Sequence, residues 1–133
     1  MVDRDIIHAK VGIIKRCLGR IRDVTRGDAA ALDAIDVQDI FVLNLQRAVQ
    51  GTLDLAAHVV ASEGLGMPQE LREHFDLLES KKIIDPLLCG KMKKMVGFRN
   101  IAVHDYQTLS PDVLKSILKN SLGDLEEFYA AIA

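Results

Sequence analysis

The sequence predicts an all-α protein: an antiparallel bundle of about five helices in a single domain that covers residues 1–133. Apolar residues recur at steps of three and four along most of the chain, which is the spacing of amphipathic helices. Aromatic residues make up only 5% of the chain and Trp is absent, whereas β-rich domains rely on aromatic and β-branched residues. A chain of 133 residues is long enough to bury one sizeable core but not two.

The first half of the chain contains two long predicted helices. The first runs from Asp3 to about Val24, with Asp3 as its N-cap. Its apolar stripe consists of Ile7, Val11, Ile14, Leu18 and Ile21. A break follows from Gly27 to about Ala34, and the second helix runs roughly from Val37 to Glu63, where Gly64 begins a glycine-containing turn.

Three further helices are predicted in the second half. The third starts at Pro68, which suits a first helical position, and ends near Lys82. Asp85 and Pro86 are the expected cap and first residue of a fourth helix that continues to about Val103. The same pattern, a cap residue followed by proline, occurs at Ser110-Pro111 and begins a fifth helix. The buried edge of this helix is Leu114, Leu118, Leu122, Leu125 and Tyr129.

Charge and cysteine content narrow the class of protein. The net charge is -2 and the pI is near 6.1, which excludes a uniformly basic nucleic-acid binder and leaves room only for a local basic site. The longest stretch free of acidic and basic residues is Leu55 to Ser62, so neither a signal peptide nor a membrane span is expected. Cys17 and Cys89 form no C-x-x-C pair or disulfide framework, and we expect a cytoplasmic protein.

The fourth predicted helix has an unusual charge, because no acidic residue occurs from Pro86 through His104. The four basic residues Lys91, Lys93, Lys94 and Arg99 all lie in this segment. Lys91 and Lys94 are therefore predicted to contact RNA. A solvated lysine face, balanced by acidic residues of a neighbouring helix, is the alternative interpretation.

Four chemically useful side chains lie close together at the end of the fourth helix: Arg99, Asn100, His104 and Tyr106. Asn100 and His104 are four residues apart on one helix face, so the amide is placed to orient the imidazole. On a regular helix Arg99 lies about 7.5 Å along the axis from His104 and roughly 140° around it. The two converge on one ligand only if the helix bends or ends, or if a second subunit completes the site.

These side chains suit phosphodiester cleavage without a metal ion. A histidine near its ordinary pKa can accept and donate a proton at neutral pH. The planar guanidinium group of an arginine binds phosphate with two parallel hydrogen bonds, and a tyrosine hydroxyl can donate a further one. RNA supplies its own nucleophile in the 2′-hydroxyl, so a protein need only shuttle protons and stabilise the phosphate. A polar cluster that merely caps helix carbonyls is the structural alternative.

The segment from Met95 to Tyr106, with its R-N-x-x-x-H-x-Y string and apolar lead-in, resembles the signature of the HEPN superfamily. In particular, it looks like that of HepT-like toxins, which are encoded beside minimal nucleotidyltransferase antitoxins. The stretch from Arg47 to Pro68 is similar to the second helix of that family and its following turn.

The resemblance implies a HEPN bundle that dimerises about a two-fold axis and acts as a metal-independent endoribonuclease toxin without a cofactor. It makes Arg99 and His104 the catalytic pair, with Asn100 and Tyr106 in support. It also implies that the partner nucleotidyltransferase antitoxin neutralises the toxin by adenylylating Tyr106. A second hypothesis from another class is a non-catalytic helical partner that binds nucleotide or substrate for a nucleotidyltransferase. No metal site is expected, because Asp33, Asp36 and Asp39 are explained by the preference for acidic residues at a helix start.

Overall fold

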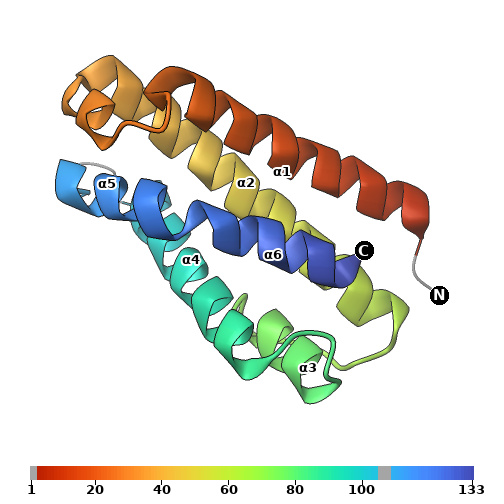
Figure 1. Cartoon of the computed structure of the whole chain (residues 1–133). Helices are drawn as coiled ribbons and strands as arrows, with labels where there is room; N and C mark the ends of the chain where they lie inside the picture. The colour runs from red at the N-terminus through yellow and green to blue at the C-terminus, as the bar shows by residue number, and fades with distance from the viewer. Residues whose placement is uncertain (1–2, 105–108) are drawn as a thin grey trace.

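The computed structural model describes residues 3–104 and 109–133. Over these ranges the chain forms six α-helices and one short 3-10 helix, and no strand. The elements are α1 (Arg4–Thr25), η1 (Ala29–Asp33), α2 (Ile35–Ser62), α3 (Glu73–Ser80), α4 (Pro86–His104), α5 (Pro111–Asn120) and α6 (Leu122–Ile132). This confirms the predicted all-α class and the antiparallel bundle (Figure 1).

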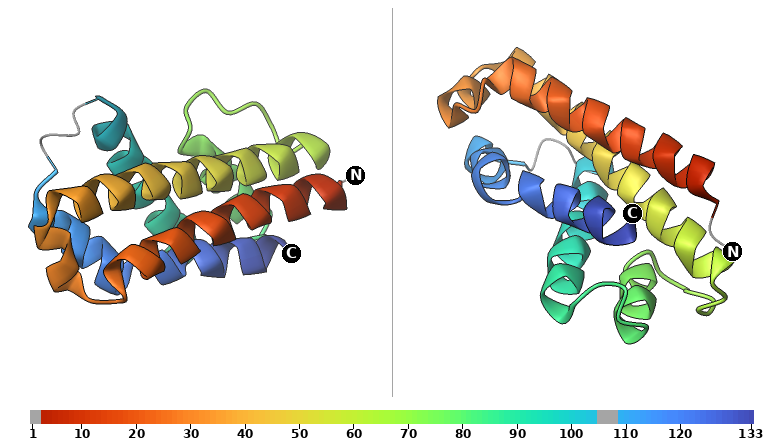
Figure 2. Two further views of the ribbon diagram at one scale, coloured as in Figure 1. Left: turned by 90° about the horizontal axis from the view of Figure 1, so that it is seen from above. Right: turned by 45° about the vertical axis from the view of Figure 1, so that its right-hand side comes forward.

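The bundle is built on the pair α1 and α2, which run antiparallel and side by side along most of their length (Figure 1). The C-terminal helix α6 contacts both of them and α4 as well. Figure 2 shows α1, α2 and α6 running nearly alongside one another, whereas α4 crosses this layer at a steep angle. Arg99, near the end of α4, contacts Gln50 in the middle of α2.

Three of the predicted helix caps are confirmed. The Asp3 carboxylate accepts hydrogen bonds from the backbone N–H groups of Asp5 and Ile6, and the Asp85 carboxylate accepts one from Leu88 N at 2.7 Å. The Ser110 hydroxyl accepts a hydrogen bond from Val113 N, directly before Pro111 opens α5. These side chains satisfy backbone donors that have no partner within the helix, so they fix where each helix begins.

Two of the predicted boundaries differ in the structure. The third helix begins at Glu73 and not at Pro68: residues 69–72 form bends and turns, and the Glu73 carboxylate accepts a hydrogen bond from Gln69 N there. The single predicted fifth helix is divided at Ser121, which lies in a stretch of weak helix formers before Gly123. The division lets α5 pack against η1 while α6 packs against α4 and α2.

Large apolar side chains from several helices fill the core. Phe41 of α2, Phe75 of α3 and Phe128 of α6 are almost completely buried. The rings of Phe75 and Phe128 meet edge to face with their centroids 5.4 Å apart, which ties α3 to α6. Burial of these rings and of the aliphatic stripes provides the main stabilisation, and it sets the position of α4 against α2.

No helix in the described part of the chain combines the length and the hydrophobicity that crossing a bilayer requires.

Candidate functional site

Arg99 and Asn100 are adjacent residues of α4, and the Arg99 side chain reaches α2. Arg99 Nη1 donates a hydrogen bond to Asn100 Oδ1 at 3.2 Å, and Arg99 Nη2 donates one to Gln50 Oε1 at 3.0 Å. Both side chains at positions 99 and 100 are half-buried. Neutral oxygen atoms from two helices therefore fix the direction of the guanidinium group.

His104 is the last residue of α4, and its side chain is exposed. The hydrogen bonds of Arg99 that the structure describes go to Asn100 and Gln50, and none goes to His104. Within one chain the structure thus pairs Asn100 with Arg99 rather than with His104. Tyr106, the fourth residue of the predicted cluster, lies outside the described residues.

The lysines of α4 have different surroundings. Lys91 Nζ lies 3.5 Å from an Asp124 oxygen and 3.7 Å from a Glu127 oxygen, both on α6. Lys93 forms an ion pair with Asp76 of α3 at 2.7 Å, and this hydrogen bond raises the pKa of the Lys93 ammonium. Lys94 is exposed, and it takes part in none of the ion pairs among the described residues. The positive charge of α4 is therefore partly balanced by its neighbours, and it is most available at Lys94.

A further cation, Arg72, lies over α4 close to the motif. Its Nε donates a hydrogen bond to Lys93 O at 3.3 Å, and its guanidinium group approaches Gly97 so closely that a Cβ at position 97 would lie 2.7 Å from Arg72 Nη2. Arg72 could not be predicted from the motif, because only the fold brings it to α4. The glycine at position 97 is the one local signal of this close approach.

A cavity of about 540 Å³ opens beside Asn100, between α4 and the segment that leads into α3. Its lining includes Arg72, His74 and Val96, together with residues 68–71. The cavity adjoins the pair of Arg99 and Asn100, since Asn100 belongs to both. An arginine, an asparagine and a histidine around one opening offer donors to an anionic or polar ligand.

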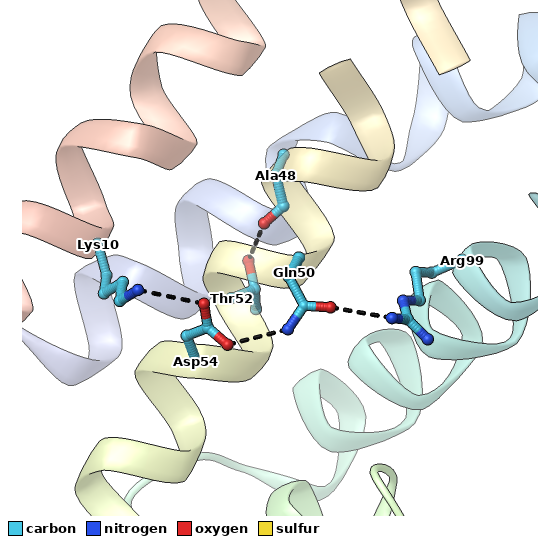
Figure 3. A network of polar contacts seen from close by, with 6 residues as sticks. All are labelled: Lys10, Ala48, Gln50, Thr52, Asp54 and Arg99. Atoms are coloured by element: carbon cyan, nitrogen blue, oxygen red, sulfur yellow. Dashed lines mark hydrogen bonds and ion pairs between the residues drawn. The ribbon is translucent and has the colours of Figure 1, made fainter. Parts of the chain in front are cut away.

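Gln50 is the second residue that the motif does not reveal. It lies four residues before Asp54 on α2, and Gln50 Nε2 donates a hydrogen bond to Asp54 Oδ1 at 2.9 Å (Figure 3). Gln50 is exposed and Asp54 is half-buried, and two polar residues four positions apart on one helix face are the signal that could have identified this pair. In the described residues, no group of three or more His, Cys, Asp or Glu side chains is arranged to hold a metal ion.

Known proteins resemble this chain in sequence over nearly its whole length. The family described as "Ribonuclease HepT-like" matches residues 14–132. The curated mRNA nuclease HepT of Shewanella oneidensis is 41% identical over 128 residues, which cover 96% of each chain.

Solved structures are similar over the same range. A toxin–antitoxin crystal structure with AMP-PNP has a TM-score of 0.91 at 41% identity, covering 96% of this chain and 97% of that one. A tri-AMPylated HEPN toxin from Shewanella oneidensis, in complex with its MNT antitoxin, has a TM-score of 0.90 at 42% identity and covers 96% of both chains. YutE, a cytosolic protein of Bacillus subtilis, shares the fold at 18% identity, with a TM-score of 0.84 over 98% of this chain and 88% of that one. The resemblance inferred from the motif is thus confirmed, and the chain belongs to the HepT-like ribonuclease family.

Proposed function

We propose that this chain is the cytoplasmic toxin of a toxin–antitoxin module, a metal-independent endoribonuclease that acts as a homodimer. The observation that carries the proposal is the complete Arg99-to-Tyr106 motif in a chain that matches the HepT-like ribonuclease family from residue 14 to residue 132. The relative in Shewanella oneidensis is named an mRNA nuclease, which indicates RNA as the substrate class.

His104 and Arg99 are the proposed catalytic residues. His104 removes the proton from a ribose 2′-hydroxyl, and the 2′ oxygen attacks the adjacent phosphorus. The bond from phosphorus to the 5′ oxygen breaks, and a protonated histidine returns a proton to that oxygen. The products carry a 2′,3′-cyclic phosphate and a 5′-hydroxyl. Arg99 holds the phosphate oxygens while negative charge accumulates on them, a contribution that fixed cations make in a partly dehydrated site.

The placement of these two residues supports the proposed homodimer. Arg99 faces α2, whereas His104 is exposed at the end of α4, and no hydrogen bond joins them in the described part of one chain. A two-fold axis near the end of α4 brings two copies of each residue to one cleft. One histidine then acts as the base and the other as the acid.

RNA is proposed to follow the basic side of α4. Lys94, with its exposed ammonium group, and Arg72 are suited to phosphate, and the cavity beside Asn100 has room for part of a nucleotide. Lys91 is also assigned to RNA contact, with the acidic residues of α6 sharing its charge. Asn100 supports the site by holding Arg99.

Neutralisation is proposed to occur at Tyr106, through adenylylation by a minimal nucleotidyltransferase antitoxin. A relative of this chain has been crystallised in a tri-AMPylated form with its MNT antitoxin. Adenylate groups two residues after His104 add bulk and negative charge at the motif, so they exclude RNA phosphates by repulsion and by volume.

Two variants test the catalytic assignment. His104→Ala and Arg99→Ala are expected to abolish both growth arrest on expression and RNA cleavage in vitro, with unchanged helical circular dichroism. Arg20→Ala, which removes an exposed arginine of α1, is the matched control and retains the activity. Growth arrest that survives both site variants would contradict the proposal and favour a non-catalytic partner of a nucleotidyltransferase.

A further inference from the structure

Four side chains from three helices form a continuous polar network that ends at Arg99 (Figure 3). Lys10 of α1 contacts Asp54 Oδ2 at 3.2 Å, and Asp54 Oδ1 accepts a hydrogen bond from Gln50 Nε2 at 2.9 Å. Gln50 Oε1 then accepts from Arg99 Nη2 at 3.0 Å. The guanidinium group on α4 is thereby connected to α1 through α2.

The two partners of Gln50 in this network, Arg99 and Asp54, determine how the Gln50 amide is oriented. A guanidinium group has only donors, and an ionised carboxylate has only acceptors. The amide between them must therefore turn its NH₂ group toward Asp54 and its oxygen toward Arg99. Lys10 holds the other carboxylate oxygen of Asp54, so the carboxylate itself has little freedom to rotate.

The two groups that accept hydrogen bonds from Arg99 are neutral amides. None of the ion pairs among the described residues includes Arg99. Its described partners are the amide oxygens of Gln50 and Asn100, which direct the guanidinium group without cancelling its charge. The carboxylate of the network, Asp54, is one residue further away and is paired with Lys10. A carboxylate in the place of Gln50 would compete directly with a phosphate for the same donors.

We propose that Gln50 is a positioning residue for Arg99, oriented by Asp54 and Lys10, which aims the guanidinium group at the RNA phosphate while leaving its positive charge available. The inference rests on the catalytic role proposed for Arg99. It adds a residue from a different helix, 49 positions away in the sequence, to the machinery of cleavage.

The network lies at the surface, which allows positioning to be separated from stability. The hydrogen bonds of Gln50 to Arg99 and to Asp54 are both exposed, and exposed hydrogen bonds contribute little to folding. Loss of the Gln50 side chain is therefore expected to leave the thermal midpoint nearly unchanged. Its effect should be seen in catalysis, because small displacements of a catalytic group lower rates strongly.

The test compares Gln50→Ala, Gln50→Glu and the control Gln46→Ala, one helical turn earlier on α2, by steady-state cleavage of a defined RNA. Gln50→Ala is expected to lower kcat about tenfold with a small change in KM, because Arg99 keeps its charge but loses its direction. Gln50→Glu is expected to lower kcat about 100-fold and to raise KM, because the new carboxylate pairs with Arg99. Gln46→Ala should match the parent protein.

Thermal midpoints and Arg99→Ala are measured alongside. Wild-type kcat in both Gln50 variants, with Arg99→Ala inactive, would overturn the role of Gln50 and leave that of Arg99 intact. Full activity in Arg99→Ala would overturn the proposed role of Arg99 and this inference with it. An equal loss in Gln50→Ala and Gln46→Ala, or a matching fall in thermal midpoint, would assign the effect to the helix and contradict positioning.

Discussion

Gly51 of α2 faces Ile14 of α1 so closely that a Cβ at position 51 would lie 3.1 Å from Ile14 Cγ1. Ile14 is fully buried, so its side chain has no solvent-filled space into which it could move. The two longest helices of the bundle are therefore in close contact beside Gln50. This contact fixes the part of α2 that carries the polar partner of Arg99.

Gly51→Ala is expected to lower the free energy of unfolding by about 1 kcal/mol. Overpacking of a filled core costs about 1–3 kcal/mol, which exceeds the gain of roughly 1 kcal/mol from replacing glycine by alanine in a helix. Gly90→Ala on α4 is the matched control, since nothing lies within 4 Å of the added Cβ, and it is expected to stabilise the protein. Urea unfolding followed by circular dichroism measures both. An increase in stability in both variants would contradict the tight approach of α1 and α2.

Much of the fold follows from local sequence signals. Asp3, Asp85 and Ser110 cap helices as predicted, because capping depends on residues only two or three positions apart. The break at Ser121 was not predicted, since the apolar spacing continues through it and the gain lies in tertiary contacts of α5 with η1. The start of α3 at Glu73 likewise follows bends and turns over residues 69–72, which the apolar spacing does not reveal.

The candidate site was only partly predictable for the same reason. Arg99, Asn100 and His104 form a contiguous motif, and the structure places all three toward the end of α4. Gln50 and Arg72 come from other parts of the chain and meet the motif only in the folded protein. Asn100 was expected to orient His104 from its spacing, yet its carbonyl oxygen accepts a hydrogen bond from Arg99. Spacing along a helix identifies possible neighbours, but it does not decide which of them forms the hydrogen bond.

The cysteine thiols are expected to react slowly with iodoacetamide at pH 8. Burial raises the pKa of Cys89 from 9.0 to about 11, and Asp76 and Glu79 add to the rise. Burial also raises the pKa of Cys17. Thiolate is the reactive form, so a raised pKa leaves little of it at pH 8. Intact-mass measurement should show almost no alkylation of the native protein and two additions after unfolding in urea. Rapid double alkylation without urea would contradict the buried placement of these residues.

The raised pKa of Cys89 also sets the sign of one pH effect on stability. Between pH 9 and pH 11 the unfolded chain loses the thiol proton while the folded chain keeps it, so the free energy of unfolding falls as pH rises through this window. Cys89→Ala should make the decline shallower in urea unfolding at these pH values. An unchanged slope would contradict the contribution of Cys89.

Co-expression with the nucleotidyltransferase is expected to add adenylate mass to this chain, and Tyr106→Phe is expected to prevent the addition. The phenol is the proposed acceptor, and phenylalanine keeps the ring while removing the oxygen. Intact-mass spectrometry measures the shift, with Tyr129→Phe on α6 as a matched control that retains it. Adenylate that persists in Tyr106→Phe would place the modification elsewhere.

A mixed dimer is expected to have well under half of the wild-type activity. Differently tagged parent and His104→Ala chains are co-expressed, and the mixed species is isolated through both tags. One histidine then lacks its counterpart in the shared cleft, so either proton removal or proton return is lost. Half of the wild-type kcat in the mixed dimer would indicate two independent sites and contradict a shared cleft.

Cleavage of RNA in excess EDTA, with analysis of the product ends, tests the central claim most directly. The purified protein, unmodified at Tyr106, is compared with His104→Ala. The parent alone is expected to cleave the RNA and to leave 2′,3′-cyclic phosphate and 5′-hydroxyl ends. Cleavage that requires added divalent metal, or that His104→Ala performs equally well, would contradict a proton shuttle at His104 beside a phosphate held by Arg99.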